Sequence, residues 1–188
     1  MIRKFLFLTT FIAFIGCKPQ PSQLQLPNII SSGMVLQQQS KVSLWGKARP
    51  ISEVSISTSW GAFGVATVAS DSSWIVKLDT PKAGDSQQIT LVNDDSTLVL
   101  SNVLMGEVWL CSGQSNMEMP LAGWPPTDTI NNSVAEFAAA NYPSIRLFTV
   151  ARNFSSEKVN DVTGTWLTCT PENAARFSAT SYFFGRKL

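Results

Sequence analysis

The sequence contains no histidine, and this absence bears most directly on function. Histidine is the usual general base near neutral pH, so a serine hydrolase built from these residues alone has no evident acceptor for the serine proton. Charged residues are also scarce, at 14% of the 188 residues, and the formal net charge is only +1. This balance gives no electrostatic reason to expect a nucleic-acid partner. Nothing in the sequence calls for a metal ion or a cofactor.

Cysteine is rare as well, with three residues, and the first of them belongs to an export signal. Residues 1–17 combine the basic pair Arg3-Lys4, an apolar stretch and a terminal Gly16-Cys17, which is the layout of a secretory signal peptide. The last four residues resemble a bacterial lipobox, which predicts lipidation at Cys17 and a place in the periplasm or at the outer membrane. The alternative is an ordinary signal peptide with an incidental cysteine. A lipid anchor would be the only contact with the membrane.

The other two cysteines, Cys111 and Cys169, leave two readings open. In an oxidising compartment they could pair, but nothing in the sequence brings their Cα atoms within bridging distance. Two free, buried thiols are the alternative.

What the chain does contain is a hydrophobic fraction of 44%, enough to bury a core and to argue against disorder. Residues 18–27 are rich in Gln and Pro and are typical of a tether. Residues 28–105 show apolar residues alternating with polar ones in short runs separated by turn residues, which predicts a small antiparallel β-sandwich. The alternating runs centre on Val42 and Leu44, Val54 and Ile56, Phe63 to Thr67, Trp74 to Leu78, Ile89 and Leu91, and Leu98 and Leu100.

The pattern changes after residue 105, and residues 106–188 are typical of an α/β domain. Val108–Cys111 is a continuous apolar run, which predicts a strand buried on both faces. An Ala-rich helix is expected over 134–141 and a second strand over 145–150. Thr170, followed by Pro and Glu, predicts a helix start, and residues 174–188 then continue as one helix.

The segment whose residues could take part in catalysis follows the predicted buried strand. Gly113 permits backbone angles closed to other residues, so a tight turn would place Ser115 just past the strand's carboxyl end, where open α/β sheets bind ligands. A serine at a helix start has free N–H groups nearby that can stabilise an oxyanion. The competing interpretation is a capping box, in which Ser115 and Glu118 only close a helix start.

The run GEVWLCSGQSNMEMP, residues 106–120, closely resembles the nucleophile block of the sialate O-acetylesterase family, a branch of the SGNH (GDSL-like) hydrolases. Three other segments resemble the family in the same order: 44–48, 74–91 and 177–186. The resemblance extends from about residue 27 to residue 188. It implies a β-sandwich followed by the first part of an SGNH-hydrolase-like α/β domain.

By this resemblance, the Ser115 hydroxyl attacks acetyl esters on sialic acid or other glycans, and the Ser115 backbone N–H helps to hold the oxyanion. Gly113, Gln114 and Asn116 would support the oxyanion site and its turn, although turn chemistry alone also explains the last two. Trp124 is a wall for the substrate in one interpretation and a ring packed under a Pro-rich loop in the other.

The family's Asp-x-x-His pair lies further along than these residues reach. The resemblance therefore implies a truncated α/β domain with an unpaired sheet edge, low stability and little or no esterase activity from this chain alone. Two alternatives remain. The chain is a non-catalytic carbohydrate- or surface-binding β-module, or a separate C-terminal half chain supplies the missing Asp and His.

Overall fold

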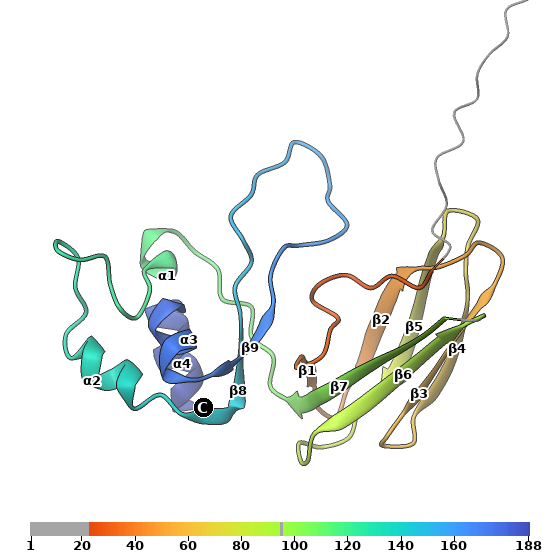
Figure 1. Cartoon of the computed structure of the whole chain (residues 1–188), viewed down its shortest axis with the longest axis horizontal. Coiled ribbons are helices and arrows are strands. Elements are labelled where there is room, and N and C mark those ends of the chain that lie inside the picture. The colour runs from red at the N-terminus through yellow and green to blue at the C-terminus, as the bar shows by residue number, and fades with distance from the viewer. Residues whose placement is uncertain (1–22, 95) are drawn as a thin grey trace, which may run out of the picture.

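A computed structural model describes residues 23–94 and 96–188 and shows a mixed α/β protein with two regions side by side (Figure 1). The β region, residues 23–106, consists of strands. The C-terminal region, residues 107–188, consists of short helices around one small hairpin. Cys17 and the signal segment lie outside the described residues. In the described part, no helix is long and apolar enough to cross a bilayer.

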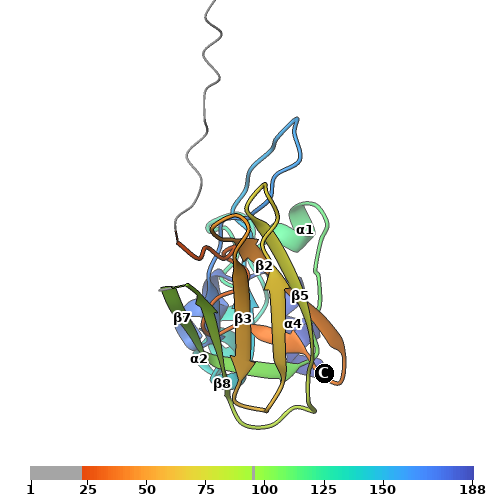
Figure 2. The same cartoon turned by 90° about the vertical axis from the view of Figure 1, so that its right-hand side faces the viewer.

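The β region is formed by two sheets whose strands run roughly along one another (Figure 2). The larger sheet has the order β1-β7-β6-β3-β4, and the smaller one pairs β2 with β5. Every pairing is antiparallel, as predicted, except that of β1 with β7, which is parallel. The strands are β1 (Val35–Gln37), β2 (Lys41–Lys47), β3 (Glu53–Thr58), β4 (Phe63–Thr67), β5 (Ser73–Asp79), β6 (Gln87–Asn93) and β7 (Ser96–Gly106).

The buried faces of these two sheets share one hydrophobic core. The predicted alternation is confirmed along β2, β3, β5, β6 and β7, because the apolar residues that defined each run point inward. It is wrong for β4, where Phe63 and Val65 face solvent and Ala66 is buried. A Cβ at Gly64 would come within 2.7 Å of Val76, so the inward positions of β4 have room only for small residues. The fully buried side chains of this core include Met34, Leu44, Val54, Ile56, Leu78, Ile89 and Leu91.

The predicted tether is wrong where the structure describes it. Gln25 exchanges two backbone hydrogen bonds with Lys47, at 2.8 and 2.9 Å, and Leu24 is buried in the core. Gly46 lies inside β2. A Cβ there would be 2.2 Å from the Gln25 carbonyl oxygen and 3.0 Å from Trp74, so close backbone approach explains this glycine.

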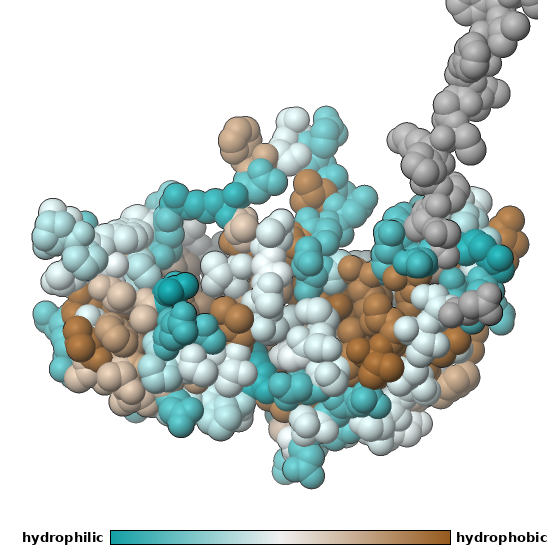
Figure 3. All heavy atoms as spheres, in the orientation of Figure 1, coloured by the Kyte–Doolittle hydropathy of each residue, from teal (hydrophilic) through white to brown (hydrophobic). Residues whose placement is uncertain are grey.

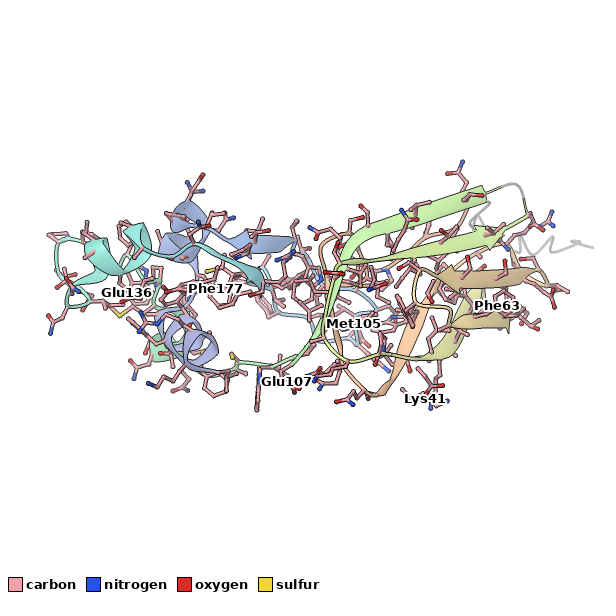
Figure 4. The ribbon with its side chains drawn as sticks, turned by 90° about the horizontal axis from the view of Figure 1, so that it is seen from below. Lys41, Phe63, Met105, Glu107, Glu136 and Phe177 are labelled. Carbon is pink, nitrogen blue, oxygen red and sulfur yellow. The ribbon has the colours of Figure 1, made fainter. Side chains whose placement is uncertain are left out.

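The C-terminal region has its own smaller core, which includes Leu121, Leu147 and Tyr182. Its two strands form an antiparallel hairpin, although the sequence predicted only the first of them. Glu136 on α2 accepts a hydrogen bond from the Tyr182 hydroxyl at 3.0 Å, at the end of the molecule opposite Phe63 (Figure 4). The elements are α1 (Ser115–Glu118), α2 (Ser133–Ala138), β8 (Tyr142–Phe148), β9 (Trp166–Cys169), α3 (Pro171–Arg176) and α4 (Ala179–Lys187).

The predicted buried strand Val108–Cys111 is not formed. Such a strand is buried when it pairs into a sheet whose two faces are both covered, and no strand of the described residues pairs with this segment. Leu110 is therefore 93% exposed and Trp109 56% exposed. Trp109 meets the edge of the Phe184 ring on α4, with ring centroids 5.1 Å apart.

The helix predicted over residues 174–188 is two helices. Phe177 is extended between them, and the Ser178 hydroxyl caps α4 by accepting from the Ser181 N–H at 3.3 Å. The break allows Phe177 and Ala179 to bond to the chain just after α1. The predicted start of α3 is confirmed, because the Thr170 hydroxyl accepts from Asn173 N–H at 3.4 Å.

Polar contacts join the two regions. The Asn28 backbone N–H and side-chain amide donate to the Asp161 carboxylate at 2.9 and 3.0 Å, and the amide also donates to the Val162 carbonyl. The Trp166 indole N–H donates to the Ile29 carbonyl at 2.8 Å while its ring packs against the β-region core. Arg146, which the sequence left without a role, donates to the Asn102 side chain.

Glu107 lies between the two regions (Figure 4). Its carboxylate accepts hydrogen bonds from the Gln37 and Gln38 amides, each at 2.9 Å. Both hydrogen bonds lower the pKa of this carboxyl because they stabilise its charged form, and the bond from Gln38 has the larger effect. This junction fixes where the segment leading to Ser115 leaves the β region.

Candidate active site around Ser115

Ser115 is the first residue of α1, and its side chain is exposed. The capping-box interpretation is wrong. Gln114 is the N-cap residue, with no side-chain cap bond, and its carbonyl accepts from the N–H groups of Met117 at 2.9 Å and Glu118 at 3.0 Å. Among residues 23–94 and 96–188, no group hydrogen-bonds to the Ser115 hydroxyl. The helix start is thus closed by backbone alone, and the hydroxyl is left available.

The residues predicted to support this turn act through their backbones. Gly113 does not adopt a left-handed conformation, so the predicted reason for this glycine is wrong. A Cβ at Gly113 would lie 3.0 Å from the Met117 Cβ, and close approach is what this position requires. Gln114 contributes its carbonyl, as above. Asn116 contributes its carbonyl too, which accepts from the Thr180 hydroxyl at 3.0 Å.

The start of α4 holds the turn from below (Figure 1). The Met117 sulfur accepts hydrogen bonds from the Ser181 hydroxyl at 3.1 Å and the Ser178 hydroxyl at 3.6 Å. The Ala179 N–H donates to the Met119 carbonyl at 2.9 Å. The sequence singled out residues 177–186 only as a family-like segment. Its position explains what the segment does, which is to anchor the turn that carries Ser115.

A second support comes from the connection between β8 and β9. Arg152 forms an ion pair with Glu118, three residues after Ser115 in the same helical turn. The Arg152 side chain is otherwise 80% exposed. Sequence reasoning missed this residue because the pair joins positions far apart in the chain, and no local pattern links them. The Glu118 carboxylate is therefore engaged by this guanidinium.

Trp124, the predicted substrate wall, lies in the loop after α1 and is 40% exposed. Its backbone exchanges hydrogen bonds with Asp128, at 2.7 and 3.1 Å, which closes a tight loop. Gly123 has a φ of +73°, and a Cβ there would meet the Asp128 carbonyl oxygen at 2.5 Å. A half-exposed ring on a closed loop has one face toward solvent, so the wall stays a prediction.

The two remaining cysteines are both free thiols. Cys111, four residues before Ser115, is exposed rather than buried as the free-thiol reading expected. Cys169 is buried at the end of β9, and this burial raises the pKa of its thiol because the thiolate is poorly solvated there.

The described site therefore has an exposed serine on a turn held by α4, without a base beside it. The chain contains no histidine, and no described side chain contacts the Ser115 hydroxyl. A serine without a base is a weak nucleophile. The geometry holds the Ser115 hydroxyl in place and leaves it open to solvent. Both are necessary for acyl transfer, but they do not complete it.

The fold is similar to that of a carbohydrate acetylesterase. A crystal structure of a carbohydrate acetylesterase from Xanthomonas citri matches it with a TM-score of 0.81 and 32% sequence identity, over 88% of this chain and 37% of that one. The sialate O-acetylesterases of Mus musculus and Homo sapiens are 32% and 30% identical over 178 residues, or 85% of this chain. No protein-family model matches. The chain is a member of the sialate O-acetylesterase-like family and spans about a third of the length of these curated relatives.

Proposed function

We propose that this chain belongs to a carbohydrate O-acetylesterase that removes acetyl groups from sialic acid or other glycans, with Ser115 as its nucleophile. The observation that carries the proposal is the Ser115 hydroxyl, which is exposed and unused by the helix cap, on a turn fixed from α4. The names of its relatives, sialate O-acetylesterase and carbohydrate acetylesterase, support the reaction class.

In this proposal the Ser115 oxygen attacks the acetyl carbonyl, and the Ser115 backbone N–H helps to stabilise the oxyanion that develops. The sugar oxygen leaves with a proton, the acetyl group stays on the serine, and water then releases acetate. The domains are a β-sandwich over 28–105 and a partial SGNH-hydrolase-like α/β domain over 106–188. The larger sheet and the β2–β5 pair enclosing one core support the first assignment.

The part of the relatives that this chain does not span supplies the acid and base in this proposal. The exposed run Val108–Leu110 supports it, because such an apolar run is typical of a strand with a neighbour on each side. Its three side chains are 46%, 56% and 93% exposed, from Val108 to Leu110. Pairing this segment with an added strand would cover them and bring the missing groups to the serine.

We also propose that the chain is exported and anchored through lipid at Cys17. The short basic and apolar leader that ends in Gly16-Cys17 supports this location. Fractionation of cells that express the full chain tests it, with Cys17→Ala beside the natural sequence. We expect the natural chain in the membrane fraction and the variant outside it. Equal membrane association of both would contradict the anchor.

The activity is tested with an activated acetyl ester and purified residues 18–188, natural and Ser115→Ala. Alone, neither protein should hydrolyse the ester above background. Mixed with the C-terminal part of a curated relative, the natural chain should gain activity and the variant should not. Loss of the serine or histidine of a comparable triad costs about 10⁶ in kcat, so the contrast will be large. A mixture that binds but stays inactive would refute the proposal.

A second candidate, a glycan-binding β-module, is favoured by one observation. Trp45 and Ile75 form a cross-strand pair on the outer face of β2 and β5, and they are 40% and 61% exposed. An aromatic ring open to solvent on a strand is a possible sugar platform. Glycan binding that survives removal of residues 106–188 and disappears in Trp45→Ala would support this candidate over the esterase.

A further inference from the structure

The connection between β8 and β9 is a loop with both ends fixed. Its base is closed by the Ala151 N–H, which donates to the Thr163 carbonyl at 2.7 Å. In Figure 1 the loop stands out from the surface on the same side of the molecule as α1. Long loops without secondary structure are uncommon in compact proteins. Compact surface loops whose two ends lie close together are frequently functional.

The two sides of this loop contact different parts of the protein. On one side, Arg152 pairs with Glu118 in the turn that carries Ser115. On the other, Asp161 accepts two hydrogen bonds from Asn28 of the β region. The loop over residues 151–163 is therefore attached at its start to the helical turn that begins with Ser115 and at its end to the β region.

The loop carries apolar side chains that pack on nothing. Phe154, two residues after Arg152, is 97% exposed, and Val159 is 55% exposed. Figure 3 shows apolar groups of this loop standing clear of the surface. Exposing a phenylalanine ring costs free energy that burial against a ligand would recover.

We propose that the 151–163 loop forms one wall of the substrate site and that Phe154 stacks on a sugar ring of the ester-bearing glycan. Arg152 is a positioning residue, which holds this wall to the Ser115 turn through Glu118. The inference rests on the proposed function, since it takes Ser115 as the centre of the site.

The chemistry of the ring favours a sugar as its occupant. A pyranose presents a face of C–H groups, which is apolar, and pockets for small molecules combine such aromatic surfaces with a few polar groups. Phenylalanine has no hydrogen-bonding group, so Phe154 would add affinity for a ring without selecting its hydroxyl pattern. Selection by hydrogen bonds would have to come from other residues at the site.

The test measures binding rather than turnover, so that its result is independent of the missing base. The full chain carrying Ser115→Ala is titrated with two probes, the methyl glycoside of 9-O-acetyl-N-acetylneuraminic acid and an O-acetylated xylo-oligosaccharide. Saturation-transfer NMR reports the dissociation constant and the sugar protons in contact. We expect binding of one probe, with strong transfer to its ring C–H protons.

In this background, Phe154→Ala should weaken binding of that probe about tenfold, whereas Phe63→Ala, an exposed phenylalanine at the far end of the β region, should leave the dissociation constant unchanged. Arg152→Gln should weaken binding as well, and Arg152→Lys, which keeps the charge for Glu118, should restore most of it. Hydrogen exchange over residues 151–163 should rise in Arg152→Gln and return toward normal in Arg152→Lys.

Binding that Phe154→Ala leaves unchanged would overturn the inference, and so would the absence of binding by either probe. Reduced self-association of Phe154→Ala, with sugar binding intact, would also overturn it by assigning the ring to a protein contact. Suppose that binding depends on Phe154, but that the chain mixed with the C-terminal part of a relative shows no hydrolysis that depends on Ser115. This result would support the wall and refute the esterase.

Discussion

The β region and the C-terminal region differ in how completely each buries its own apolar side chains. In the β region, both sheets turn their apolar faces to one core, and side chains such as Leu44 and Ile56 are fully buried. The C-terminal region has a smaller core of helices packed on one hairpin, and it leaves Leu110 and Phe154 almost wholly in solvent.

This difference separates two roles within one chain. The β region has the properties of a scaffold, since buried apolar area is the main source of folding free energy. The C-terminal region holds the Ser115 turn, the 151–163 loop and the exposed segment before α1. Ligand-binding segments are drawn from the less stable parts of proteins. We therefore expect the second region to depend on the first for its order, and the dependence to run mainly in that direction.

The largest effect should follow from cavities placed in each core in turn. Ile56→Ala in the β region and Leu147→Ala in the C-terminal region should each cost about 2–5 kcal/mol in the free energy of unfolding. Hydrogen exchange resolved by peptide should show the contrast. Ile56→Ala should speed exchange in both regions, because Trp166 packs on the β-region core, whereas Leu147→Ala should act only beyond residue 106.

Val65→Ala is the matched control, since Val65 lies on the exposed face of β4. It should leave exchange unchanged in both regions. Equal opening of the β region by Leu147→Ala would contradict the proposed direction of dependence.

The next effect concerns the contact between the regions. Asn28→Ala removes the side-chain bonds to Asp161 and Val162, which should cost about 1 kcal/mol because the groups are exposed. Exchange should rise over residues 151–163 and stay unchanged in the β-region core. Asn28→Asp should be worse, since it places a second carboxylate against Asp161. An Asp variant as stable as the natural chain would argue that this contact does not hold the loop.

Local patterns predicted the β region well and the C-terminal region only in part. Alternation along a strand is set by neighbours two residues apart, so five strands could be predicted without knowing their partners. The Thr170 cap was predictable for the same reason. Val108–Cys111 was not, because the burial of an apolar run depends on distant strands that a local pattern cannot supply.

The site shows the same limit at the level of single residues. Ser115 and Glu118 match a capping box by spacing, and only the backbone bonds to Gln114 reveal that the hydroxyl is unused. The ion pair between Glu118 and Arg152 joins two elements that no periodicity relates. Glycine at position 113 reflects close approach to the Met117 side chain, and not the turn angles that the sequence suggested.

A smaller effect should come from the contacts beneath the Ser115 turn. Thr180→Val removes the hydroxyl that donates to the Asn116 carbonyl while keeping the shape of the side chain. We expect a loss of about 0.5–1 kcal/mol in stability and faster exchange of the amides in residues 115–119. Thr180→Ser keeps the donor and should exchange like the natural chain. Faster exchange in both variants would assign the effect to packing of the Thr180 methyl group.

The smallest effect on stability should come from the exposed apolar run Val108–Leu110 before α1. Leu110→Ser replaces a side chain that is 93% exposed, so the free energy of unfolding should change by less than about 0.5 kcal/mol. Sedimentation should show weaker self-association, because an apolar run without a neighbour favours contact between copies. Leu121→Ser, in the buried core of the same region, is the contrasting variant and should be strongly destabilising. A loss above 1 kcal/mol for Leu110→Ser would mean that this side chain is buried in solution, and the contrast between the regions would then need revision at this segment.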